Sequence, residues 1–390
     1  MKNVDRYYSI SDFEKKAREL MPRCVAGYVC GGTEEETSLV ESLSVMKRIG
    51  FRHRGLQPVD QRTSEVSIFG QTYAMPVGFA PTGFSAIVMH DCDTALATVA
   101  TQARIPFVIS GASNVPLERL QQTAGNQCWY QAYLPGDISR IDKLLTRLKK
   151  ANIPVLVVTI DTCVAGNREN IKRLDFTVPF KISPRLILDG ILHPGWSVNV
   201  FMRTLIKSGI PRFSNLYEEI GPPITEDPPN GFRGGRDKLS WEHIRWIREN
   251  WDGKLVLKGV MHPEDAGLAV AAGVDGLIVS NHGGRQLDGS ISPLQALPDI
   301  IDVVSGAIPV MIDGGFRRGA DVLKAVALGA SMVFTGRPQL YGAAVAGTAG
   351  IHKVVDILLS EIDTNMALLG CSRLQDLTSD CLQKLDAPRL

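Results

Sequence analysis

The residues best suited to chemistry lie in one stretch, residues 280–288, which reads Ser-Asn-His-Gly-Gly-Arg-Gln-Leu-Asp. It follows the apolar run 276–279, so a buried strand is expected to open into a loop here. His282 and Arg285 stand three residues apart, and the two glycines between them permit a tight turn. An imidazole can accept a proton, and a guanidinium can hold a carboxylate through paired hydrogen bonds. This pair suits a small 2-hydroxy acid.

The strands that must position this stretch are predicted from eight short apolar runs, each of which ends in a polar residue or a turn. They are residues 77–80, 107–109, 129–130, 155–158, 255–257, 277–279, 309–312 and 332–334. Amphipathic stretches of helical length follow most of them, at residues 93–104, 138–150, 263–272, 294–304 and 320–328. The repeated strand–helix order predicts an α/β protein with a parallel sheet, and eight repeats predict a (β/α)8 TIM barrel.

Two further segments accompany the barrel, which is expected to occupy about residues 75–370 of a single domain spanning 1–390. A helical pattern over residues 12–29 runs through Pro22 and predicts an N-terminal helical extension. A long insertion after strand 4, about residues 166–239, far exceeds an ordinary βα connection and is expected to be a lid, a membrane contact or both. Its part 221–231 is rich in turn-forming residues and is expected to be poorly ordered.

Polar residues or turns follow all eight strands, at the barrel end where chemistry gathers. A single Ser or Thr there usually caps a helix, but a set drawn from every strand is hard to explain as caps. The loops 313–319 and 335–338 place glycine amides and arginines after strands 7 and 8, where many barrels bind a phosphate. They predict a phosphorylated cofactor.

Composition narrows the class of protein. The formal net charge is +1 and no Lys/Arg block occurs, so nucleic acid is not an expected partner. The seven cysteines are scattered without C-x-x-C spacing, which predicts reduced core thiols and neither a disulfide framework nor a metal site. The N-terminus has no apolar signal-peptide core, so a cytoplasmic location is expected. No segment is uninterrupted enough to predict a transmembrane helix.

Residues 280–288 closely resemble the signature of the family of FMN-dependent 2-hydroxy acid oxidases and dehydrogenases, and the resemblance extends over nearly the whole chain. It implies an FMN cofactor and a homotetramer. By similarity, FMN would contact Pro81, Thr82, Gly83, Ser110, Gln131, Thr159, Lys258 and Ser280. Its phosphate would be held by Asp313, Gly314, Gly315, Arg317, Gly336 and Arg337. Lys258 could stabilise negative charge on the reduced flavin ring.

The same resemblance implies roles around the substrate. The carboxylate would meet Tyr28, Arg168 and Arg285. Tyr133 would hydrogen-bond the reacting hydroxyl and His282 would take its proton, while Asp161 would hold the resulting imidazolium. A base and the group that orients it form a common catalytic arrangement.

Two positions depart from the glycolate oxidases of this family and match its mandelate dehydrogenases: Ala112 replaces a tryptophan, and Gly83 replaces an alanine. The run 188–197 carries the same closer resemblance. Ala112 predicts room for an aromatic or bulky substrate side chain. Gly83 implies that oxygen is a poor acceptor, so that electrons pass to a membrane quinone or a similar acceptor.

Other functions remain open. An L-lactate dehydrogenase or a 2-hydroxy acid oxidase that produces hydrogen peroxide is the near alternative. An FMN-dependent isomerase is a remote one, because it gives no role to His282 and Arg285. A non-catalytic binding protein would leave Asp161 and Tyr133 without a purpose.

Residues 180–216 combine many apolar side chains and Trp196 with a basic fringe, and Asp189 is their only acidic residue. Such a composition suits the interface between lipid headgroups and acyl chains. It predicts peripheral attachment to the inner face of the cell membrane. Packing on the barrel or on a neighbouring subunit as a lid is the alternative.

Overall fold

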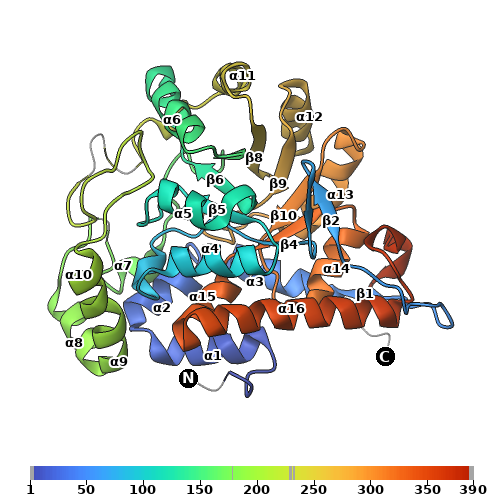
Figure 1. Ribbon diagram of the computed structural model, residues 1–390, viewed down its shortest axis with the longest axis horizontal. Helices are drawn as coiled ribbons and strands as arrows, with labels where there is room; N and C mark the ends of the chain where they lie inside the picture. Colours follow the sequence, from blue (N-terminus) through green and yellow to red (C-terminus); the bar gives the residue numbers. More distant parts are fainter. Residues whose placement is uncertain (1–3, 178, 228–230, 232, 386–390) are drawn as a thin grey trace.

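The chain forms a closed barrel of eight parallel strands in the computed structural model, which describes residues 4–177, 179–227, 231 and 233–385 (Figure 1). The strands are β4 (Val77–Phe79), β5 (Phe107–Ser110), β6 (Cys128–Ala132), β7 (Val155–Thr159), β8 (Lys254–Val260), β9 (Gly276–Val279), β10 (Val310–Asp313) and β11 (Met332–Thr335). Each pairs with the next, and β11 closes on β4. All eight predicted runs are strands, and the predicted TIM barrel is confirmed.

Helices alternate with the strands and cover the barrel. They are α4 (Cys92–Gln102), α5 (Leu117–Ala124), α6 (Ile138–Lys150), α11 (Trp241–Asn250), α12 (Pro263–Ala271), α13 (Pro293–Val304), α14 (Gly319–Ala327), α15 (Arg337–Ala346) and α16 (Thr348–Leu369). Helix α6 illustrates how the sequence specifies them. The side chain of Asp137 caps its first turn, Ile141 and Leu145 lie on its buried face, and basic residues occupy its last turn.

A hairpin closes the end of the barrel opposite the site. It consists of β2 (Val66–Ile68) and β3 (Gln71–Tyr73). Ile68 and Tyr73 pack among the inward-facing side chains of the barrel, and Trp129 donates a hydrogen bond to the Tyr73 hydroxyl over 3.3 Å. Because this end is filled, the carboxyl ends of the strands form the accessible mouth.

The N-terminal extension is not the single helix predicted over residues 12–29. It consists of α1 (Ile10–Leu20) and α2 (Arg23–Cys30), separated by Met21 in an extended conformation. Pro22 explains the break, because proline lacks an N–H group and disfavours helical geometry in the preceding residue. After α3 (Thr37–Ser44), strand β1 (Ile49–Phe51) pairs with β12 (Leu382–Lys384) near the C-terminus.

The long insertion separates β7 from α11. After α7 (Glu169–Lys172), its first half contains α8 (Pro184–Leu192), α9 (Pro194–Trp196), the π-helical turn η4 (Ser197–Met202) and α10 (Arg203–Ser208). These four elements form a group beside α1 and α2, at the lower left in Figure 1.

The stretch 221–231 was predicted to be poorly ordered, but residues 221–227 follow a defined path. The backbone N–H of Phe180 donates to Ile224, and that of Gly221 donates to Phe213. Residues 228–230 lie outside the described residues.

The cysteines were predicted to be core thiols. Five of the seven are buried, whereas Cys163 is exposed and Cys381 is partly exposed. Cys163 lies outside regular strands and helices, in the loop after β7. Cys381 lies at the edge of the small β1–β12 sheet.

Candidate active site

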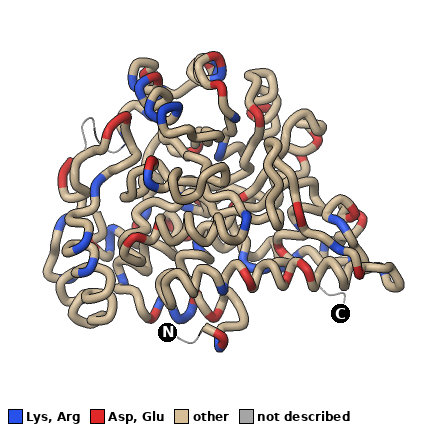
Figure 2. The backbone as a smooth tube through the Cα atoms, viewed as in Figure 1, with Lys and Arg blue, Asp and Glu red and all other residues tan. Residues whose placement is uncertain are grey.

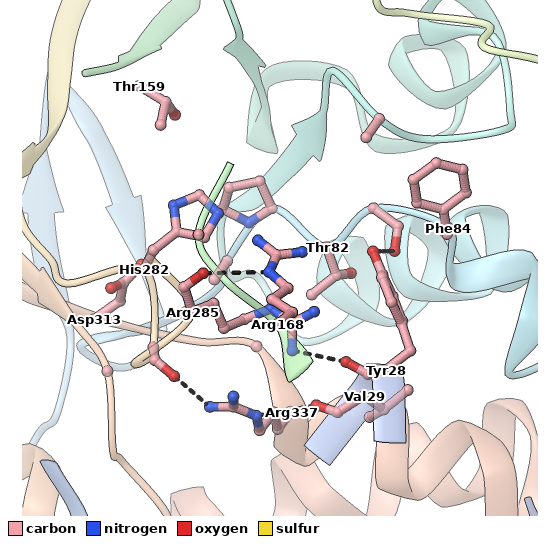
Figure 3. Close-up of a pocket in the computed structure, with 18 of the residues that line it drawn as sticks. Tyr28, Val29, Thr82, Phe84, Thr159, Arg168, His282, Arg285, Asp313 and Arg337 are labelled. Atoms are coloured by element: carbon pink, nitrogen blue, oxygen red, sulfur yellow. Dashed lines mark hydrogen bonds between the residues drawn. The ribbon is translucent and has the colours of Figure 1, made fainter. Parts of the chain in front are cut away.

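A cavity of about 630 Å³ opens at the carboxyl ends of the barrel strands. Every strand or the loop after it contributes to the wall, through Ala80, Ala112, Gln131, Thr159, Lys258, His282, Asp313 and Thr335. Helix α2 adds Tyr28 and Val29 from the N-terminal extension, and the long insertion adds Arg168. Figure 3 shows Tyr28, Arg168, His282 and Arg285 around this one space.

The structure brings together almost all of the residues predicted from the sequence. Those that line the cavity are Tyr28, Pro81, Thr82, Gly83, Ala112, Gln131, Tyr133, Thr159, Arg168, Lys258, His282, Arg285, Asp313, Gly314, Gly315, Arg317, Gly336 and Arg337. Ser110, Ser280 and Asp161 lie behind the wall. Ser110 accepts a hydrogen bond from the backbone of Ala112, and Ser280 accepts one from the backbone of His282. These two serines therefore support the cavity wall.

His282 and Asp161 form a hydrogen-bonded pair. The Nδ1 atom of His282 lies 3.0 Å from Oδ1 of Asp161. With the proton on Nδ1, the histidine donates to the carboxylate and its Nε2 atom is left as the proton acceptor. Burial lowers the pKa of His282, and Asp161 opposes that shift without reversing it. The histidine is therefore neutral at neutral pH and ready to act as a base.

The backbone of His282 has a positive φ of 56°, a conformation that is uncommon for residues other than glycine. Such strain persists where the surroundings enforce it, often at functional sites. Here the backbone N–H donates to the hydroxyl of Ser280 while the ring is held by Asp161. The loop thus fixes both ends of the side chain.

Lys258 presents a buried positive charge to the cavity. Its Nζ atom lies 2.7 Å from Oδ2 of Asp313 and donates a 2.7 Å hydrogen bond to Ser280. Burial by itself would lower the pKa of Lys258, but the carboxylates of Asp313 and Asp161 outweigh it and raise the pKa. The lysine remains charged.

Two arginines meet beside Tyr28. Arg285 donates from Nη1 to the carbonyl oxygens of Tyr28 and Gly31, over 2.7 and 2.8 Å. Arg168 donates to the carbonyl oxygen of Arg285 over 3.2 Å (Figure 3). Burial, with the positive charge of Arg168, lowers the pKa of Arg285 to about 9. Arg285 is therefore charged at neutral pH, and two guanidiniums side by side suit binding of a carboxylate.

The loop after β10 needs glycine. Gly314 and Gly315 have φ values of 100° and 91°, and a Cβ atom on Gly315 would lie 2.2 Å from the carbonyl oxygen of Ser42. Arg337 donates hydrogen bonds to the carbonyl oxygens of Val29, Gly31 and Gly283. Its guanidinium is thereby fixed at this end of the cavity.

Sequence reasoning missed two arginines of the insertion, Arg233 and Arg236, which also line the cavity. The guanidinium carbon of Arg236 lies 4.2 Å from the centre of the Tyr133 ring, and Arg233 donates to the carbonyl oxygen of Val164. The only sequence signal is the pair of basic residues flanking a Gly-Gly turn just before α11. It lies in a stretch without helical or strand periodicity.

Residues 17–384 match the family of FMN-dependent dehydrogenases. The chain belongs to this family. It is 35% identical over 377 residues to the (S)-mandelate dehydrogenase of Pseudomonas putida, covering 96% of this chain and 94% of that one. It is 34% identical over 375 residues to an L-lactate dehydrogenase of Acinetobacter baumannii, covering 95% and 96%. The predicted class, an FMN-dependent 2-hydroxy acid dehydrogenase, is confirmed.

Solved structures agree with this family. The crystal structure of the monotopic membrane protein (S)-mandelate dehydrogenase superposes with a TM-score of 0.89 at 34% identity, covering 97% of this chain and all of the other. A mandelate oxidase superposes with a TM-score of 0.80 at 31% identity, covering 97% of this chain and 98% of the other.

The cavity of this FMN-dependent dehydrogenase fits its cofactor. Three buried polar atoms on its wall have no hydrogen-bond partner among the described residues: Nε2 of Gln131, Oγ1 of Thr159 and Oδ1 of Asp313. Buried polar groups without partners are costly and rare, so these three atoms favour a polar ligand at this place. The edge of a flavin ring supplies both donors and acceptors, and the glycine- and arginine-bearing loops after β10 and β11 suit its phosphate.

The geometry of His282 generates the first prediction. His282→Asn should keep bound FMN, because an amide can still occupy the loop, while flavin reduction by substrate slows by about 10²- to 10⁴-fold, as expected for a lost general base. Anaerobic stopped-flow absorbance measures the reduction, and the visible flavin spectrum controls for cofactor binding. Reduction near the wild-type rate would remove His282 from the mechanism.

The lowered pKa of His282 gives a second prediction. The neutral base is present above its pKa, so kcat/KM should stay constant through neutral pH and fall only as the pH drops through a value below 6.5. In Asp161→Asn the opposing charge is gone, so the acid limb should move to lower pH and the plateau should fall. The measurement is kcat/KM between about pH 5 and 8. An acid limb at the same pH in both proteins would show that another group titrates.

Proposed function

We propose that this enzyme oxidises an (S)-2-hydroxy acid with an aromatic or otherwise bulky side chain, similar to mandelate, to the 2-oxo acid, and that it passes the electrons to a membrane quinone or a similar acceptor. The proposal depends on one observation above all. A neutral histidine oriented by a carboxylate faces the same cavity as two charged arginines. A proton acceptor beside a carboxylate-binding site is the arrangement that oxidation of a 2-hydroxy acid needs.

In this proposal, residues of the chain bind the substrate carboxylate, hydrogen-bond its hydroxyl and accept its proton. Arg285 and Arg168, with the Tyr28 hydroxyl, bind the substrate carboxylate and orient the hydroxyl-bearing carbon. Tyr133 hydrogen-bonds the hydroxyl, and Nε2 of His282 accepts its proton. Asp161 then stabilises the imidazolium across the 3.0 Å contact, which is shorter and stronger once charged.

When bound, FMN would accept the two electrons together with the hydrogen that leaves the hydroxyl-bearing carbon as it becomes a carbonyl. Lys258 places a positive charge where negative charge would develop on the reduced ring. Because Asp313 and Ser280 hold its Nζ atom, that charge is fixed in place before the reaction.

Room for a bulky side chain comes from two small residues. A Cβ atom on Gly83 would lie 2.7 Å from the Cβ atom of Ala112, so the two positions border the same space. Phe84, Phe213 and Leu216 complete an apolar cluster around Ala112. This wall supports a mandelate-like substrate rather than glycolate or lactate. The effect of Gly83 on oxygen reactivity stays a prediction.

The long insertion supports a peripheral membrane location. The exposed apolar side chains of its first half are Ile182, Ile187, Leu188, Ile191, Leu192, Val198, Phe201, Met202, Ile206 and Ile210. Several Lys and Arg residues lie on the same group of helices (Figure 2). Asp189, the only acidic residue of segment 180–216, is buried and accepts a hydrogen bond from the backbone of Cys24. The outward face is therefore apolar and basic, as an anionic lipid surface requires.

The range predicted for this contact, 180–216, extends too far. Phe213, Ser214, Asn215 and Leu216 are buried, and Asn215 accepts hydrogen bonds from the backbone of Leu117 and from the hydroxyl of Tyr130. These four residues pack on the barrel, so the proposed membrane face ends near Ile210. Among the described residues, no helix has the length and apolarity needed to cross a bilayer.

A direct contact connects this face to the cavity. The indole Nε1 of Trp196 donates a 2.7 Å hydrogen bond to the carbonyl oxygen of Ile87. Ile87 ends the short helix η2 (Ser85–Ile87), which directly follows the cavity residues Gly83 and Phe84. Proximity of the proposed membrane face to the flavin side of the cavity favours a membrane acceptor. Assembly as a homotetramer stays a prediction.

The substrate pocket yields a third prediction. (S)-Mandelate or (S)-phenyllactate should exceed glycolate in kcat/KM in a dye-reduction assay. Ala112→Trp should lower kcat/KM for mandelate more than for glycolate, because pocket shape discriminates by about 1 to 3 kcal/mol per apolar group. The same assay run with oxygen alone and a peroxide detector separates a dehydrogenase from an oxidase. If glycolate is the better substrate of the unmodified enzyme, the inference from Ala112 is wrong.

The membrane face yields a fourth prediction. The enzyme should sediment with vesicles containing anionic lipid at low salt. Replacing two exposed residues of α8, Leu188→Glu with Ile191→Glu, should leave it in the supernatant, because acidic side chains oppose both apolar burial and the anionic surface. Leu368→Glu, an equally exposed leucine on α16, is the matched control and should sediment. Failure of the unmodified enzyme to sediment would favour the lid alternative.

A further inference from the structure

The cavity holds more positive charge than the cofactor and a single substrate carboxylate use. Its charged lining residues are Arg168, Lys172, Arg233, Arg236, Lys258, Arg285, Arg317, Arg337 and the acidic Asp313. Lys258 is paired with Asp313, and Arg317 and Arg337 lie at the loops proposed for the phosphate. Arg168 and Arg285 suffice for one carboxylate. Lys172 is exposed, whereas Arg233 is partly buried and Arg236 is buried.

Arg233 and Arg236 are placed beside the reacting centre. Arg236 lies against the ring of Tyr133, whose centre is 6.4 Å from that of the His282 ring. Arg233 is anchored to the carbonyl oxygen of Val164 at the start of the insertion. Both arginines therefore border the part of the cavity next to Tyr133.

Gathering these charges is unfavourable without an anion. Burial lowers the pKa of Arg233 and the neighbouring charge of Arg168 lowers it further, while Tyr133, Tyr28 and Asp161 oppose that shift without reversing it. Burial likewise lowers the pKa of Arg236 to about 10, with Arg233 contributing. None of the ion pairs formed within the described part of the chain includes Arg233. Positive groups that repel one another in a buried site favour an anionic ligand between them.

We infer that Arg233 and Arg236 form a second anion subsite, and that among bulky 2-hydroxy acids the enzyme prefers those whose side chain carries a further acidic group. The inference rests on the proposed function and specifies its substrate class. One end of the substrate, the 2-hydroxy carboxylate, meets Arg168 and Arg285. The apolar cluster around Ala112 and Phe84 accommodates the connecting atoms, and the distal acid meets Arg236 and Arg233.

The test compares acids that differ only in the distal charge. Anaerobic flavin reduction is measured with (S)-malate, (S)-2-hydroxyglutarate and (S)-2-hydroxyadipate, each beside the 2-hydroxy monocarboxylate of equal carbon number. For at least one pair, the dicarboxylate should have a kcat/KM at least tenfold higher, mainly through a lower KM. Arg236→Gln and Arg233→Gln should each reduce that ratio about tenfold, whereas Arg236→Lys, which keeps the charge, should preserve part of it.

The matched control is Arg173→Gln. Arg173 belongs to the same insertion, but it is exposed and pairs with Glu169 on the surface, so the ratio should not change. If monocarboxylates reduce the flavin as efficiently as their dicarboxylate partners, or if the Arg236 and Arg233 variants affect both acids equally, the second subsite is refuted while the proposed function stands. If no 2-hydroxy acid reduces the flavin, the proposed function fails and the inference fails with it.

Discussion

The C-terminal end of helix α2 organises the mouth of the barrel. The last carbonyl groups of a helix have no partner within it, and the helix dipole makes this end attractive to cations. Here those carbonyls accept hydrogen bonds from Arg285 and Arg337, which come from the loops after β9 and β11. The contact fixes both guanidiniums, brings Tyr28 to the cavity and attaches the N-terminal extension to the barrel. The proposed carboxylate and phosphate sites are therefore connected through one helix end.

The fold could be predicted because buried parallel strands are continuous apolar runs, and the polar residues that end them share one edge. This is why nearly every predicted site residue lines the cavity. Ser110 and Ser280 were also predicted as cofactor contacts, but the sequence does not reveal which side of the wall each hydroxyl faces. The break between α1 and α2 was missed because the helical pattern continues through Pro22, whose steric effect outweighs it.

Arg233 and Arg236 could not be found for a different reason. The connection that carries them has no periodic pattern, and its Gly-Gly and proline-rich composition indicates only turns. These arginines are positioned by contacts with residues distant in the sequence, Tyr133 and Val164. The insertion thus has two parts that its composition does not distinguish. Its first half presents apolar side chains outward, and the end of its second half directs positive charge inward.

The concentration of positive charge in the cavity also affects how substrate arrives. A cleft with walls of one charge and low dielectric constant focuses its field into the solvent and accelerates encounter with ions of opposite charge. An anionic membrane surface has the reverse effect, because it depletes small anions from the solution next to it. An enzyme seated on such a surface through α8–α10 would meet fewer substrate anions than one in bulk solution. The arginines at the mouth would counteract this depletion, so the field proposed to bind the substrate would also set how fast the substrate is captured.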